Sequence, residues 1–216
     1  MWSSRAVTSS ALRREPVQGR SRARVAAIVA AAERLVVAEG VDALTMRRLA
    51  AQAGVPIGSV YQFFADREAV IGHLVAQHGL GQRRLLEDMA PLSGTRPFLD
   101  LVEELFDRQC ARLRASPAYV AIWVARALPV EEQQRDDDDV EVLAAMLAEL
   151  VAAETGSDPS VAVLTGCRVA VQAADALLHL SFRLDPDGDP DTLAEATTML
   201  RRYLEHVAAE ASQTAR

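Results

Sequence analysis

The sequence predicts an all-α protein of about nine helices, and three observations support this fold class. Half of the 216 residues are hydrophobic and only 5% are aromatic. The apolar residues are mostly Ala, Leu and Val, and Ala and Leu are strong helix formers. Apolar residues recur at helical spacing along most of the chain, and no stretch alternates with the period of two that a strand shows. The length suits one small domain and one medium domain.

Charge divides the chain into a basic N-terminal part and an acidic remainder. Residues 1–68 carry 10 Arg against 6 acidic residues, which gives +4, and residues 69–216 carry 13 Arg against 24, which gives −11. The net charge of −7 hides this asymmetry. It favours contact between the N-terminal part and a polyanion.

Several other function classes lack their characteristic residues. The two cysteines lie far apart, as is typical of reduced, buried thiols in a cytoplasmic protein. No apolar run approaches the roughly 18 residues of a membrane span, so we expect no membrane partner. There is no secretory signal, no GxSxG motif, no phosphate-binding loop and no acid/base pair, so we expect neither an enzyme nor a cofactor. The acidic residues between Glu131 and Glu141 have no His or Cys among them, so no metal is predicted.

The first 20 residues are predicted to be a disordered basic arm, because they are polar, contain several Arg and lack periodicity. The arm either contacts phosphates or a minor groove, or has no role. The first helix is expected over residues 22–39, and Gly40 ends it. Its buried stripe is formed by Val25, Ile28, Val29, Ala32, Leu35 and Val36.

Residues 44–64 predict two short helices joined by a tight turn. Thr45 is an N-cap candidate, because its hydroxyl can accept a hydrogen bond from an amide at the helix start. Gly54 tolerates the left-handed conformation that ends a helix, and Pro56 fits the start of the next one. Two helices with a glycine turn between them are the parts of a helix-turn-helix DNA reader. A further helix is expected to start at Asp66 as its N-cap and to stop at Pro91.

From residue 22 to about residue 80 the chain resembles the DNA-binding domain of the TetR family of bacterial transcriptional regulators. The residues that carry the resemblance are Ala31-Ala32, Glu39-Gly40, Leu44-Thr45, Leu49-Ala50, Ala53-Gly54-Val55, Gly58-Ser59-Val60-Tyr61, Phe63-Phe64 and Arg67-Glu68. It implies a three-helix DNA-binding head over residues 21–80 and a helical ligand-binding and dimerisation domain over residues 81–216. The helix after Asp66 would join the two and transmit ligand binding through its tilt.

The resemblance also implies where DNA is contacted. Phosphates would be held by Thr45, Tyr61 and Arg67. Base edges would be reached from Arg47, Ile57, Ser59 and Gln62. Gly58 would let the backbone approach the DNA closely, and Arg48 would add affinity.

The chain departs from the family pattern at Pro56 and Ile57, so the second reader helix carries no positive charge. Among the base-edge candidates, Arg47 suits guanine, Gln62 suits adenine, and Ile57 would touch a thymine methyl. Simple core packing is the alternative for Tyr61 and for Phe63.

The remainder is predicted to hold five helices separated by turn residues. Their expected ranges are 97–114, 116–127, 140–154, 159–184 and 193–207. Residues 129–138 are predicted to be an acidic loop. The last two helices are expected to form a homodimer as a four-helix bundle. Close approach would be allowed by Gly166, Ala170, Ala173 and Ala174, unless these face the protomer's own core.

A small-molecule pocket is expected between the helices of this domain. Candidate lining residues are Phe106, Cys110, Tyr119, Trp123 and Met146, with ordinary core packing as the alternative. A polar stripe follows one face of a later helix and comprises Arg168, Gln172, Asp175 and His179. The stripe is equally compatible with a ligand, the dimer seam and water.

We interpret the chain as a homodimeric regulator, a repressor that an unidentified small molecule releases from a palindromic double-stranded operator. Two half-sites would lie one DNA turn apart, about 34–36 Å. One alternative is a DNA-binding regulator whose second domain only dimerises or answers a protein partner. Another is a helical enzyme or carrier with a non-functional head. The sequence does not identify the ligand, the operator or the regulated genes, or separate a repressor from an activator.

Overall fold

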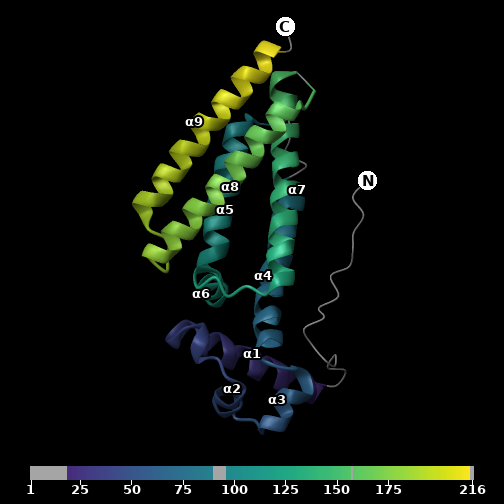
Figure 1. Cartoon of the computed structure of the whole chain (residues 1–216), viewed down its shortest axis with the longest axis vertical. Helices are drawn as coiled ribbons and strands as arrows, with labels where there is room; N and C mark the ends of the chain where they lie inside the picture. The colour runs from purple at the N-terminus through teal and green to yellow at the C-terminus, as the bar shows by residue number, and fades with distance from the viewer. Residues whose placement is uncertain (1–18, 90–95, 157, 215–216) are drawn as a thin grey trace. The chain divides into compact units, whose positions relative to one another are not determined.

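The computed structural model describes residues 19–89, 96–156 and 158–214. Within these ranges it contains nine α-helices, one 3-10 turn and no strand, which confirms the predicted all-α fold class (Figure 1). Most of the predicted arm and Pro91 lie outside the described residues. Gly19 and Arg20, which were assigned to the arm, belong to the first helix.

The N-terminal elements are α1 (Gly19–Glu39), the 3-10 turn η1 (Val41–Ala43), α2 (Met46–Ala53), α3 (Ile57–Phe63) and α4 (Arg67–Met89). All six residues of the predicted α1 stripe are buried. Gly40 follows α1 with a φ of 82°, a left-handed value that favours glycine. Asp66 caps α4 as predicted, since the Ala69 amide donates to its Oδ1 at 2.8 Å. These local signals set where α1 ends and where α4 begins.

The C-terminal elements are α5 (Phe98–Arg114), α6 (Pro117–Val124), α7 (Val130–Thr155), α8 (Val161–Leu184) and α9 (Pro190–Thr214). The loop predicted over residues 129–138 is wrong, because α7 begins at Val130 and continues through the acidic run. Glu and Gln are good helix formers, and acidic side chains near a helix N-terminus interact favourably with its dipole. The run of Asp was therefore misread as a break.

The start of α8 also differs from the prediction. Ser160 is the N-cap, and its hydroxyl accepts a hydrogen bond from the Val163 amide at 3.2 Å. Pro159 therefore precedes the helix and is not its first residue. The helix end at Leu184 agrees with the prediction.

Helices α8 and α9 pack side by side, and small residues allow their close approach (Figure 1). A Cβ atom added to Gly166 would lie 2.7 Å from Cγ2 of Val207 on α9, and Ala170 is buried. These two residues therefore face the protomer's own core, which was the alternative to the dimer seam. Ala173 and Ala174 are half-buried.

One helix, α8, is long and apolar enough by length and composition to cross a membrane. The expectation that no such segment exists was therefore wrong. The evidence for a span is weak, because a core helix of a water-soluble domain has the same composition. A third of its most apolar window is already buried within the protomer.

The chain separates into two compact units. Of the described residues, the first comprises 19–79 and 121–132, and the second comprises 80–89, 96–120, 133–156 and 158–214. The first unit therefore includes a short segment that the sequence analysis had placed in the C-terminal domain.

Candidate nucleic-acid interface

The first helix of the helix-turn-helix, α2, begins at a side-chain N-cap. Thr45 has an extended backbone, with φ −120° and ψ 149°, and its Oγ1 accepts a hydrogen bond from the Arg48 amide at 3.3 Å. This confirms the predicted N-cap. Leu49 and Ala50 face the core and are buried. The opposite face of α2, which carries Arg47, is open to solvent.

The turn between α2 and α3 depends on one left-handed residue. Gly54 has φ 66° and ψ 31°, a conformation that other residues adopt at a cost. The next amide, that of Val55, donates back to the Ala50 carbonyl at 3.1 Å. Helix α3 then starts after Pro56, whose carbonyl accepts from the Ser59 amide at 2.8 Å. The left-handed Gly54 and the helix start at Pro56, both predicted from the sequence, are confirmed.

Helix α3 has one buried face and one exposed face. Val60 and Phe63 are only 0% and 2% exposed, so core packing accounts for Phe63. On the other side, the apolar side chain of Ile57 and the aromatic side chain of Tyr61 are 46% and 44% exposed although both are large. They lie four residues apart and therefore on one face. Gln62 is exposed as well.

Gly58 is next to Ile57, and a Cβ atom added to it would meet no other atom within 4 Å. Packing inside the protomer therefore does not require glycine here. An approaching duplex would meet bare backbone at this position, as the sequence analysis expected of a close contact.

Arg48 is engaged on the protein surface. Its Nη2 lies 2.5 Å from Oε1 of Glu39 at the end of α1. The hydrogen bond from Arg48 lowers the pKa of the Glu39 carboxyl, and the same bond raises the pKa of the guanidinium. Both side chains are almost half exposed, so the pair adds little to stability and can be exchanged for a phosphate at small cost.

Arg67 is held more firmly. Its Nε donates to the Leu44 carbonyl and its Nη2 to the Val41 carbonyl, each at 3.0 Å. Asp42 and Glu68 form ion pairs with it at 3.7 and 3.3 Å. The guanidinium therefore ties the first turn of α4 to the turn that precedes α2. The phosphate contact implied for Arg67 stays a prediction, and this internal role was not visible in the sequence.

A second feature missed by the sequence analysis lies behind α3. The rings of Phe64 and His73 meet edge to face, with centroids 5.6 Å apart. Burial lowers the pKa of His73, because the charged imidazolium would lose its hydration there. A histidine on the inner side of α4 is not distinguished by spacing from an exposed one, so no sequence signal marked it.

Comparison with known families identifies the arrangement. Residues 28–74 match the family described as "Bacterial regulatory proteins, tetR family", and residues 97–208 match "Tetracyclin repressor-like, C-terminal domain". The second match alone spans more than half of the 216 residues. The chain belongs to the TetR family. Its helix-turn-helix is the DNA-binding element of a transcriptional regulator.

Solved structures agree with this assignment. A TetR-family transcriptional regulator from Streptomyces coelicolor is 29% identical, with 85% of this chain and 99% of that chain covered and a TM-score of 0.56. A gamma-butyrolactone receptor is 20% identical, with coverage of 90% and 99% and a TM-score of 0.61. The regulator FadR from Bacillus subtilis, in complex with stearoyl-CoA, is 16% identical, with coverage of 83% and 97% and a TM-score of 0.59. The last two share the fold. No curated protein matched the sequence.

The pocket candidates of this TetR-family chain do not all fall together. Phe106 and Cys110 on α5 are buried, and Tyr119 on α6 and Met146 on α7 are half-buried. All four belong to the second compact unit, whereas Trp123 belongs to the first. Burial raises the pKa of the Cys110 thiol to about 11, so it stays protonated and unreactive at neutral pH.

The polar stripe on α8 is partly explained. Arg168 donates from Nε and Nη2 to the two carboxylate oxygens of Glu141 on α7, both at 2.7 Å, and so links two helices of one protomer. Gln172 is exposed and His179 is half-buried. Asp175 is exposed as a residue, yet nearby protein desolvates its carboxyl and raises its pKa, an effect that His179 partly offsets.

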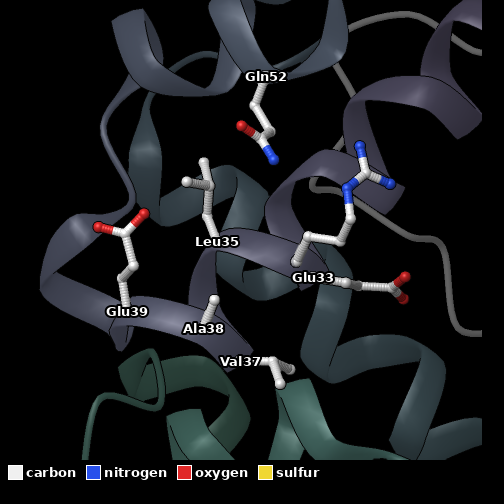
Figure 2. Close-up of a pocket in the computed structure, with 7 residues that line it drawn as sticks. Glu33, Leu35, Val37, Ala38, Glu39 and Gln52 are labelled. Carbon is white, nitrogen blue, oxygen red and sulfur yellow. The ribbon is translucent and has the colours of Figure 1, made fainter.

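A surface hollow of about 480 Å³ lies between α1 and α2 and is lined by none of the pocket candidates (Figure 2). Its lining residues are Glu33, Arg34, Leu35, Val37, Ala38, Glu39 and Gln52. Figure 2 shows the Gln52 side chain directed toward Leu35 across the hollow. The Glu39 carboxylate at its rim is the one paired with Arg48.

Proposed function

We propose that this TetR-family regulator is a repressor that binds a palindromic operator as a homodimer and is released by a small molecule. The observation that carries the proposal is the exposed face of α3. The inner side chains of α3, Val60 and Phe63, are at most 2% exposed. On the outer face, Ile57 and Tyr61 are each more than 40% exposed. A helix-turn-helix places this face in the major groove.

The proposed contacts separate into two classes. Thr45 and Tyr61 hold phosphates, and Arg48 adds positive charge once it exchanges Glu39 for DNA. Base edges are read by Arg47, Ile57, Ser59 and Gln62, with Gly58 allowing close approach. Phosphate contacts fix the register, and base contacts supply the sequence preference.

Dimerisation is supported by the outer side of α8. Val161, Val169 and Leu184 are 83%, 48% and 61% exposed on a helix that is otherwise strongly apolar. Exposed apolar surface of this kind favours association, because each Å² removed from water contributes about 25 cal/mol. Half-buried Ala173 and Ala174 leave room for a partner helix. Two heads are needed because one short reader contacts few base pairs.

A small-molecule effector is supported by the family and by two of the similar structures. One is described as a gamma-butyrolactone receptor, and another was solved with stearoyl-CoA. In this chain the candidate lining residues of the second unit are Phe106, Cys110, Tyr119 and Met146, with Gln172, Asp175 and His179 as polar candidates. A ligand releases DNA only if it binds the DNA-free conformation of the protein more tightly than the DNA-binding conformation. We expect the protein to act in the cytoplasm, where its operator is.

The test is a binding titration with duplex DNA from upstream of the gene, in competition with unrelated duplex. Wild-type protein should bind the upstream DNA selectively, and log affinity should fall steeply with log salt. Arg47→Ala should lower affinity roughly tenfold or more if the side chain pairs with guanine. Tyr61→Ala should weaken binding to all sequences.

Arg108→Ala is the matched control. It removes an exposed Arg from α5, whose partner is Glu104, and should leave DNA affinity unchanged. Equal affinity for upstream and unrelated DNA, or equal losses in the control and in Arg47→Ala, would contradict the proposal. Unchanged operator affinity in the presence of a ligand shown to bind the protein would remove the release mechanism alone.

A further inference from the structure

The exposed face of α3 has an unusual chemistry for a DNA reader. Residues 57–63 include no charged side chain. The side chains that this helix exposes most fully are the aliphatic side chain of Ile57, the ring and hydroxyl of Tyr61 and the amide of Gln62, while Ser59 is half-buried. Ile57 is the first residue of α3, and the N-terminal residues of a recognition helix are those that meet base edges.

An aliphatic side chain at this position discriminates between bases. The C5 methyl group of thymine is the only apolar group that the base pairs of unmodified DNA present in the major groove. Against it, Ile57 buries apolar surface on both partners. Against the amino or carbonyl edges of the other bases, it would strip water from a polar group and offer no hydrogen bond in return. The preference therefore has an attractive part and a repulsive part.

The neighbours of Ile57 leave this contact open. Gly58 carries no side chain, and a Cβ atom at that position would meet nothing within 4 Å. Tyr61 lies a full turn later on the same face, and its hydroxyl needs a polar partner such as a phosphate oxygen. Pro56, which directly precedes Ile57, is uncharged. Within α3, Ile57 is thus the aliphatic group best placed to reach a base edge.

We propose that Ile57 is a specificity-determining residue that selects a thymine in each half-site of the operator. The inference rests on the proposed function and deepens it, because it names a chemical feature that the DNA must carry. It requires no identified regulated gene.

The experiment begins with selection of binding sites by the full-length protein from a random duplex library. Each thymine in the enriched half-site is then replaced, one at a time, by deoxyuridine, which keeps base pairing and lacks only the methyl group. At one thymine, wild-type affinity should fall about fourfold per half-site, or about fifteenfold when both halves are changed, as expected for one buried methyl. In Ile57→Ala this loss should shrink below about twofold, whereas Ile57→Val should keep most of it.

Two further variants serve as controls. Val37→Ala shortens another exposed aliphatic side chain of the head, 52% exposed on α1, and should leave the methyl effect at its wild-type size. Tyr61→Phe should do the same. If no methyl removal weakens wild-type binding, or if the effect persists at wild-type size in Ile57→Ala, the assignment of Ile57 is overturned. Failure to enrich any sequence would instead overturn the proposed function.

Discussion

Gly54 and Gly58 are four residues apart in the reader and are expected to respond oppositely to alanine. Gly54→Ala should destabilise the protein by about 1 kcal/mol, because a left-handed φ of 66° is strained for a residue with a Cβ. Gly58→Ala should stabilise it by up to about 1 kcal/mol, since this helical position has open space around it.

Urea unfolding of both variants measures the difference. Gly58→Ala should nevertheless bind DNA more weakly than wild type, because the added methyl would stand between the backbone and the duplex. A urea midpoint of Gly54→Ala that is unchanged or raised would show that the turn geometry does not require glycine.

His73 should make the stability of the head depend on pH. Its folded pKa is lowered from 6.5 by burial, so the unfolded chain binds a proton more readily than the folded one. The contribution of the neutral ring is therefore complete above pH 6.5 and is lost as the pH falls from there toward the folded pKa.

Between pH 7 and pH 5, the unfolding free energy should fall less in His73→Phe than in wild type. That variant keeps an aromatic ring against Phe64 and removes the titration, together with the hydrogen bond between the Nε2 atoms of His73 and Gln77. Parallel pH profiles for the two proteins would count against a buried neutral histidine.

The caps at this scale could be read from the sequence, because Thr45, Gly54 and Asp66 act within three or four residues of themselves. Arg67 could not. Its acceptors are carbonyls 23 and 26 residues earlier, and a backbone carbonyl leaves no mark in a sequence. The resemblance to the TetR family implied a phosphate contact instead.

At the scale of elements, Arg67 joins the start of α4 to η1 and to its C-cap Leu44, which precede α2. Arg67→Lys should destabilise the head by about 2 kcal/mol, because one ammonium cannot replace a planar fork that bridges two carbonyls. Hydrogen exchange should show faster opening of residues 41–45 in this variant.

A phosphate contact makes a different prediction for Arg67. In Arg67→Gln the slope of log affinity against log salt would then become shallower by about 0.9 per protomer, or about 1.8 for the dimer on a palindromic site. A purely internal role leaves the slope unchanged while affinity falls. If Arg67→Lys has the same stability and the same hydrogen-exchange rates as wild type, the two hydrogen bonds from Arg67 to backbone carbonyls are dispensable.

The packing of α8 on α9 gives a second test at this scale. Gly166→Ala should cost about 1–3 kcal/mol, because the new methyl would lie 2.7 Å from Val207. Val207→Ala should recover part of this loss in the double variant. A double variant whose loss is simply the sum of the single losses would show that the two positions do not meet.

Helix order was predictable at this scale, but several boundaries were not, above all the start of α7. Apolar stripes at helical spacing marked each helix, since burial enforces that period. The first turns of α7 carry acidic and amide side chains without such a stripe, so nothing in residues 130–139 separated a helix from a loop. The helix that packs on α8 could not be predicted from the sequence either. Small residues such as Gly166 and Ala170 allow close packing against a helix of the same protomer or of a second protomer.

For the whole molecule, the exposed side of α8 should hold two protomers together. Val169→Asp places a charge on a 48% exposed apolar position and should convert a dimer to a monomer. Operator affinity should fall with it, while the helical content stays unchanged. Val130→Asp, at an exposed position that begins α7, is the control and should remain dimeric in sedimentation.

The family and the fold could be inferred from the DNA-binding head, which is about a quarter of the chain. Its caps and turns require particular residue types at fixed positions. The effector could not, because apolar residues that line a pocket have the same spacing as residues that fill a core. Phe106 and Cys110 illustrate this, since their burial fits either role.

The most direct test of the account is the stoichiometry of the full-length protein on duplex DNA from its own upstream region, measured by sedimentation with excess competitor duplex. Two protomers should bind each palindromic site together, and a duplex with one half-site scrambled should bind far more weakly. A single protomer bound with undiminished affinity, or no preference over the competitor, would contradict it.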